Sequence, residues 1–248
     1  MSVSDEVSQR VRRALVGAGA VLFIGAGALL LRAANQPWDE LWRDGWSGAD
    51  PWLAQEHFFD HVWPADPWLP VASAAWWGGA AHLMTAVGLA LVFAAVRSPW
   101  WSRIVQVMIV GSVLVLGLGT LLAGRADAPV PTASWWYWAM APWAIGLPLI
   151  TVVLEWVRDS AHPRLLPSWV WLAWLGALLA TTPVLQLFLM PSIVGEVPPG
   201  PVDVFWSVVP PWVAGSVLLA GLVRTGRPAR PDLAGSTRVA AVGSGETA

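Results

Sequence analysis

The residues of this chain best suited to chemistry form one short polar cluster: Glu56, His57, Asp60 and His61. His57 and His61 are four residues apart, so a helix would place both imidazoles on one face, with their Cβ atoms about 5–6 Å apart. Two imidazoles and a carboxylate are ligands that Zn(II) and Cu(II) accept. We therefore take the cluster as a candidate half-site for copper or zinc. The alternative is a solvated acidic helix face that carries two histidines.

A fifth candidate ligand, His82, lies within an apolar stretch. Trp76 and Trp77 precede it and are typical of a membrane interface, which would place His82 about 8 Å deeper. An ionisable residue within a membrane is a functional candidate, and the alternative is a neutral histidine hydrogen-bonded to a neighbouring helix. The chain has only four histidines, and His162 falls on the opposite side of the expected topology. A bis-histidine haem is therefore disfavoured.

The four-residue cluster belongs to segment 34–70, which holds seven of the sixteen acidic residues and six of the twenty tryptophans. Tryptophans recur every four residues from Trp38 to Trp46, which predicts a short amphipathic helix on the membrane surface. The Asp50-Pro51 pair predicts the start of a second helix, which would carry the histidine pair. Asp66-Pro67 predicts a turn that leads back into the membrane.

Long apolar runs account for most of the remaining sequence. Each is long enough to cross a bilayer core of about 30 Å, and backbone groups in lipid must bond within their own segment, so we expect helices. The sequence thus predicts an all-α, polytopic helix bundle in one transmembrane domain, 1–224, with short interfacial helices in its first outer loop. The six expected spans are 12–33, 71–97, 104–124, 134–157, 167–190 and 204–223.

The arginines predict the orientation of these spans. All fourteen basic residues are arginines, and most flank the runs on the side that contains both chain ends. The positive-inside rule then places both termini in the cytoplasm of a bacterial cell and the protein in its plasma (inner) membrane. We expect 12–33 to be retained, because it is too long for a signal peptide. Residues 1–9 and the Gly-, Pro- and Ser-rich tail 225–248 are predicted to be disordered.

Composition removes several classes of function. The chain has no cysteine, which excludes disulfides and thiolate metal sites. It has no basic stripe, so we expect no nucleic-acid partner. It also lacks a P-loop, a GxSxG motif and an HExxH motif, so the common nucleotide-driven, serine-hydrolase and zincin mechanisms have no support. The excess of tryptophan over tyrosine is typical of an interfacial belt, although codon bias also contributes to it.

Three functions fit this pattern. The favoured interpretation is a binding or accessory subunit whose partners are the lipid bilayer and other membrane subunits, with an outer loop that binds a metal or a partner. The alternative is a metal-dependent membrane enzyme or oxidoreductase subunit that uses His57, Asp60 and His61. The third is a small-molecule permease built on the second half, where Pro142, Pro148, Pro183 and the pair Pro210-Pro211 interrupt the helices.

Overall fold

The computed structural model describes residues 3–43, 73–126, 139, 165–180, 182 and 201–226, and the side chains of 5–36, 73–125, 139, 165–180, 182 and 209–225. Within these ranges the regular structure is entirely helical: α1 (Val3–Arg43), α3 (Ala74–Ala95), α4 (Trp100–Ala126), α7 (Ser168–Leu179) and α9 (Pro201–Gly226). Three of the described segments are long and apolar enough to cross a membrane, namely Asp5–Gln36, Ala74–Ala95 and Trp100–Arg125. The expected span 134–157 lies outside the described residues except for Ala139.

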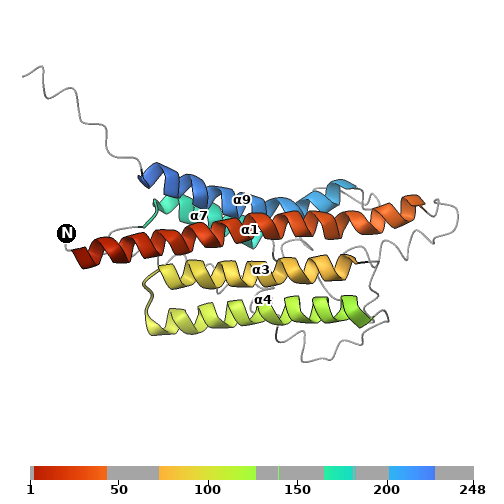
Figure 1. Ribbon diagram of the computed structural model, residues 1–248, viewed down its shortest axis with the longest axis horizontal. Coiled ribbons are helices and arrows are strands. Elements are labelled where there is room, and N and C mark those ends of the chain that lie inside the picture. Colours follow the sequence, from red (N-terminus) through yellow and green to blue (C-terminus); the bar gives the residue numbers. More distant parts are fainter. Residues whose placement is uncertain are drawn as a thin grey trace, which may run out of the picture.

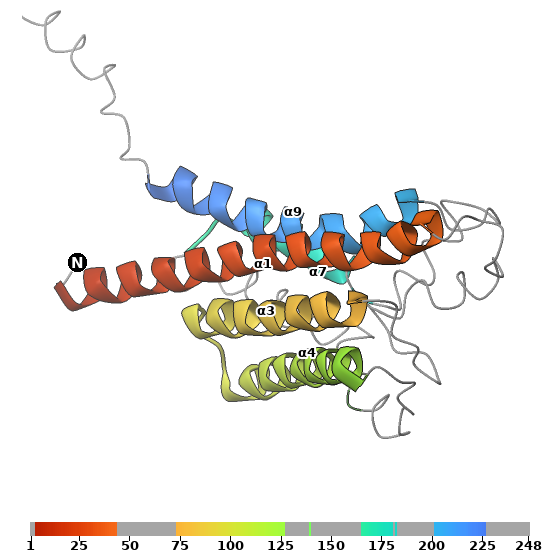
Figure 2. The same cartoon turned by 45° about the vertical axis from the view of Figure 1, so that its right-hand side comes forward.

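Helix α1 lies at the centre of the described bundle (Figure 1). It packs against α3 on one side and α9 on the other, while α4 packs on the far side of α3 and α7 packs against α9. The connection 96–99 turns α3 back into α4 at the end where α1 begins and α9 finishes, as the turned view also shows (Figure 2). We call this end the N-terminal end, and the opposite end, where α3 begins, the rim end.

Helix α1 is longer than the sequence pattern predicted. Residues 1–9 were expected to be disordered, yet the helix already begins at Val3. Asp5 and Glu6 lie in its first turn, where carboxylates interact favourably with the helix dipole. Glu6 also accepts a 2.6 Å hydrogen bond from Arg10 one turn later. These local interactions explain why a polar N-terminal stretch continues the apolar helix that follows it.

The other end of α1 also differs from the prediction of a separate surface helix from Pro37. The backbone remains helical through Pro37 to Arg43. Proline removes one backbone donor, here the N–H that would bond the carbonyl of Ala33. The helix nevertheless continues through Pro37, and α1 projects beyond the start of α3 (Figure 1). The expected helix after Asp50 lies outside the described residues.

Aromatic rings fill the core where three helices meet. Trp174 of α7 is fully buried, and its ring makes edge-on contacts with Phe23 of α1 at 6.2 Å and with Phe93 of α3 at 6.4 Å. Trp171 lies 5.7 Å from Trp174 in the same arrangement. Edge-to-face geometry is favourable because the positive ring edge meets the negative ring face. One tryptophan thus joins α7 to both α1 and α3.

Glycines allow the helices to approach one another closely. A Cβ added at Gly79 of α3 would lie 2.5 Å from the backbone nitrogen of Leu121 in α4, and one at Gly117 of α4 would lie 2.9 Å from that of Leu83. Association of helices in lipid depends on such packing, because lipid tails are as apolar as the side chains. Small residues therefore determine how closely α3 and α4 can pack.

Thr182 satisfies a carbonyl group near the end of α7. Pro183 brings no backbone N–H, so in a continuing helix the carbonyl of Leu179 would lack its donor. The Thr182 hydroxyl donates to this carbonyl at 2.7 Å, and the Thr182 N–H donates to it at 3.0 Å. Thr182 therefore supplies the donors for this carbonyl within the described part of the chain.

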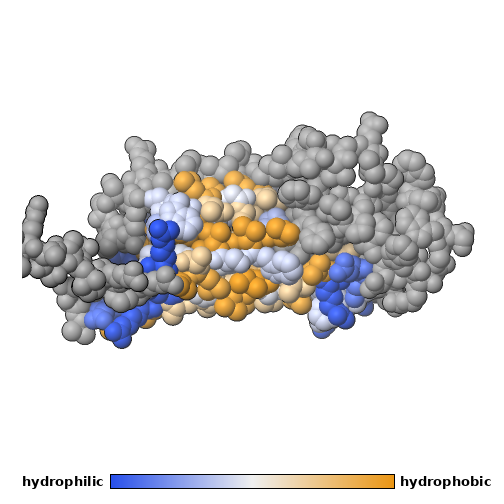
Figure 3. Space-filling model, turned by 90° about the horizontal axis from the view of Figure 1, so that it is seen from above, coloured by the Kyte–Doolittle hydropathy of each residue, from blue (hydrophilic) through white to orange (hydrophobic). Residues whose placement is uncertain are grey.

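The outer surface of the described helices is that of a membrane-embedded helical protein. Figure 3 shows a band of hydrophobic side chains between hydrophilic groups at the two ends. Arg13 and Arg32 of α1 are separated by about 28 Å, and Arg103 and Arg125 of α4 by about 33 Å, at 1.5 Å per helical residue. Both separations match a hydrocarbon core of about 30 Å. Two different helices thus place arginines at the two edges of the same apolar band.

Candidate functional site

The structure places one of the five candidate metal ligands. His82 lies on α3 and is buried, with 8% of its surface exposed. Glu56, His57, Asp60 and His61 lie outside the described residues. Within the described ranges, no three histidine or carboxylate side chains come together in a group that could hold a metal ion. The proposed metal cluster therefore stays a prediction.

His82 occupies a face of α3 that is distinct from the faces packed against α1 and α4. It is seven residues from Leu89 and eleven from Phe93, spacings that place the three side chains on one side of a helix. Phe93 packs against Trp174 of α7, and Leu89 is fully buried. One turn after His82, Thr85 donates its hydroxyl to the carbonyl of Ala81 at 2.9 Å. His82 is thus on a protein-covered side of α3, deeper than the tryptophans of the rim.

At the rim end, four residues form a closed arrangement between α1 and α3. Ser73, immediately before α3, donates its hydroxyl to the Gln36 side-chain oxygen at 2.9 Å, and the Trp77 indole donates to the same Ser73 hydroxyl at 3.2 Å. The Arg32 guanidinium lies over the Trp77 ring, 4.7 Å from its centroid. Arg32 and Gln36 are one turn apart on α1, as Ser73 and Trp77 are on α3, so two antiparallel helices present matching pairs.

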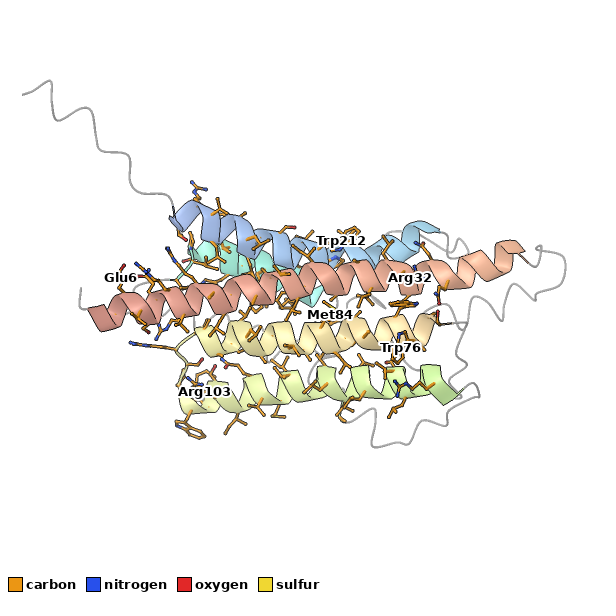
Figure 4. The ribbon with its side chains drawn as sticks, viewed as in Figure 1. Glu6, Arg32, Trp76, Met84, Arg103 and Trp212 are labelled. Atoms are coloured by element: carbon orange, nitrogen blue, oxygen red, sulfur yellow. The ribbon has the colours of Figure 1, made fainter. Side chains whose placement is uncertain are left out.

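A second stacked pair joins α3 to α4. The Arg125 guanidinium lies 4.9 Å from the centroid of the Trp76 ring. Trp76 lies at the rim end together with Arg32 (Figure 4). A Cβ added at Gly124 would lie 2.7 Å from the backbone nitrogen of Trp76, so the two helices are also in close contact here. We call the six residues the rim cluster: Arg32, Gln36, Ser73, Trp76, Trp77 and Arg125.

The rim cluster carries two positive charges, and the nearest acidic residues on its own helices are Asp39 and Glu40 of α1, whose side chains lie outside the described residues. Residues 7–36 and 73–125 contain no aspartate or glutamate. Arg32 and Arg125 are both exposed, and each lies over an indole. A guanidinium that rests on an aromatic face keeps its N–H groups directed outward in its own plane. The described part of the rim can therefore contact an anion.

The N-terminal end of the bundle uses arginine differently. Arg13 of α1 donates to the backbone carbonyl of Thr225 at 3.0 Å, and so satisfies a group at the C-terminus of α9. Arg224 lies over the ring of Trp169, 5.9 Å from its centroid. These contacts fasten α1 and α7 to the last turn of α9. As at the rim, an arginine lies over a tryptophan here, but the Arg13 guanidinium also donates to a backbone carbonyl.

Gln106 links the start of its own helix, α4, to the connection that precedes it. Its amide donates to Ser98 in the preceding connection at 2.8 Å and to Ser102 one turn earlier at 3.3 Å.

Sequence reasoning did not find the bond between Gln36 and Ser73, because the two residues are far apart in the chain. A local signal existed in the four-residue spacings of Arg32 with Gln36 and of Ser73 with Trp77.

Comparison of the chain with protein-family models, with curated proteins and with solved structures finds no match.

Proposed function

We propose that this chain is a binding or accessory subunit of a membrane assembly and presents its acidic, tryptophan-rich segment to a partner. The observation that carries the proposal is the hydrogen bond from Ser73 to Gln36. These residues bracket the segment 37–72, so the bond brings its two ends together at one point of the rim.

The composition of the loop supports a role in recognition. Segment 37–72 contains seven acidic residues and six tryptophans. Tryptophan is enriched among the residues that dominate binding energy, and complementary charge selects and orients a partner. Holding the ends of a loop in place also lowers the entropy lost when it binds. An acidic loop of this kind fits a basic partner surface.

We further propose six spans in the plasma membrane, with both termini in the cytoplasm and the loop outside. The distribution of described arginines supports this orientation. The N-terminal end carries six of them, whereas the rim end carries three, Arg32, Arg43 and Arg125. Cytoplasmic segments of membrane proteins are enriched in positive residues. The six at the N-terminal end are Arg10, Arg12, Arg13, Arg97, Arg103 and Arg224.

The test is isolation of the full chain from its native membrane in mild detergent, beside a variant with residues 44–72 replaced by a Gly/Ser sequence of equal length. We expect the natural chain to purify in fixed ratio with other membrane polypeptides, and the loop variant to purify without them. A variant that lacks residues 227–248 is the matched control and should retain its partners. A natural chain that purifies alone, or a loop variant with unchanged partners, would reject the proposal.

A second candidate function, a metal-dependent enzyme or oxidoreductase subunit, is favoured by the position of His82. The loop that carries His57 and His61 leads directly into α3, and His82 lies nine residues after Ser73 on that helix. A buried histidine on this helix could join the loop ligands if the loop folds toward the membrane. Such sites require a third or fourth ligand.

Metal analysis of the purified chain decides this second proposal. We expect stoichiometric copper or zinc in the natural chain and its loss in the His57→Ala/His61→Ala variant. His82→Ala tests whether the buried histidine contributes, and His162→Ala is the control. Absence of metal from the natural chain reconstituted with copper or zinc would reject the metal site.

A further inference from the structure

We infer that the rim cluster binds phosphate oxyanions, carried by phospholipid headgroups, at Arg32 and at Arg125. Each guanidinium is exposed and supported by an indole, at 4.7 Å from Trp77 and 4.9 Å from Trp76. The two indoles are consecutive on α3, whereas the arginines come from α1 and α4. The cluster therefore offers one cation on each side of a single helix.

The depth of these arginines fits the headgroup layer. Arg32 lies about 28 Å along α1 from Arg13, and Arg125 lies about 33 Å along α4 from Arg103. When the arginines of the N-terminal end lie at one face of a core of about 30 Å, Arg32 and Arg125 reach the other face. Trp76 and Trp77 lie at the same level, where indoles prefer to be. Lipid phosphates occupy this layer.

The chemistry of the cluster favours phosphate. Stacking uses the flat face of a guanidinium and leaves its N–H groups free to meet two oxygens at once, a geometry that matches phosphate. Neither α3 nor α4 contains an acidic residue, and the nearest on α1 are Asp39 and Glu40, about two turns after Arg32, whose side chains lie outside the described residues. Gln36 and Ser73 already bond to each other, and Trp77 donates to Ser73, so these donors and acceptors do not compete for the arginines.

The rim contrasts with an arginine that is already neutralised. Arg10 is also exposed, but it donates to Glu6 at 2.6 Å. Its charge is therefore compensated within α1, and it should not require an external anion. Arg10 provides a matched control, because its substitution removes the same side chain from a charge-balanced position.

The experiment uses the full chain in detergent and native mass spectrometry with three probes: dioleoyl phosphatidylglycerol, dioleoylglycerol and inorganic phosphate. We expect the natural chain and Arg10→Gln to retain the phospholipid, and Arg32→Gln/Arg125→Gln to bind it about tenfold more weakly. Dioleoylglycerol has the same acyl chains without phosphate and should not compete. Inorganic phosphate should compete only weakly, because it lacks the acyl chains.

Three outcomes would overturn the inference. Equal phospholipid retention by the double variant would show that the arginines are not the site, as when carboxylates of the loop occupy them. Equal competition by dioleoylglycerol would show that the acyl chains alone bind. Equal affinity for inorganic phosphate would show that the ligand is a free anion and not a lipid. Should the glutamine variant fail to fold, Arg32→Lys/Arg125→Lys keeps both charges without the planar fork, and it must show weakened phospholipid binding.

Discussion

Ser73 donates a 2.9 Å hydrogen bond to Gln36 and so ties the start of α3 to the rim end of α1. This one contact brings together two residues separated by the whole acidic segment. The same serine accepts a bond from Trp77, so the contact is part of the wider rim cluster.

Cysteines at these two positions should form a cross-link. The chain contains no cysteine, so Gln36→Cys/Ser73→Cys would carry the only thiols. Because the natural side chains touch, we expect a short bifunctional thiol reagent to join them in high yield, as mapped by peptide mass spectrometry. Gln36→Cys/Ser98→Cys is the control, since Ser98 lies at the opposite end of α3, about 30 Å away. Equal cross-linking of the two pairs would contradict the arrangement.

The glycine contact between α3 and α4 should not tolerate a methyl group. At Gly79 a Cβ would lie 2.5 Å from the backbone nitrogen of Leu121, which cannot move aside as a side chain would. We expect Gly79→Ala to lower the free energy of unfolding by about 1–3 kcal/mol, measured by thermal or SDS-induced unfolding. A Cβ added at Gly111 would meet no atom of the described residues within 4 Å. Gly111→Ala should therefore be neutral, or more stable by up to about 1 kcal/mol.

Trp212 should contribute to the contact between α9 and α1 through its indole nitrogen. Trp212 directly follows the proline pair Pro210-Pro211 inside α9. Its indole nitrogen donates to the backbone carbonyl of Ile24 in α1 at 2.9 Å. Trp212→Phe keeps an aromatic ring but loses the donor, and should destabilise the bundle by about 0.5–1.5 kcal/mol. Trp100→Phe is the control because Trp100 is 75% exposed. An equal effect of both substitutions would argue against the bond.

Labelling of single cysteines should separate the two ends of the bundle. Ser98 lies in the connection at the N-terminal end and Ser73 at the rim end. With both termini in the cytoplasm, we expect a membrane-impermeant maleimide added to intact cells to label Ser73→Cys but not Ser98→Cys. A reporter fused after Thr225 should be cytoplasmic, on the same side of the membrane as Ser98. Labelling of Ser98→Cys alone would reverse the orientation, and labelling of both would show that the two ends do not lie on opposite sides.

Local sequence predicted the described helices better than it predicted their limits. The spans expected at 71–97 and 104–124 correspond to α3 (Ala74–Ala95) and α4 (Trp100–Ala126). The expected boundaries of the first helix were wrong at both ends, because α1 already begins at Val3 and remains helical through Pro37 to Arg43. Four of the five candidate metal ligands, those of the loop, lie outside the described residues. The structure describes the position of the fifth, His82.

Sequence by itself determined that this is a helical membrane protein, since apolar runs of about 20 residues can satisfy their backbone in lipid only as helices. It also predicted how far His82 and the arginines lie from one another along their helices, because rise along a helix is a local property. Only the tertiary structure decided that Trp174 joins three helices, that Gln36 meets Ser73, and that Arg32 and Arg125 rest on neighbouring indoles. These contacts join residues far apart in the chain, so they depend on which small-residue faces pack together.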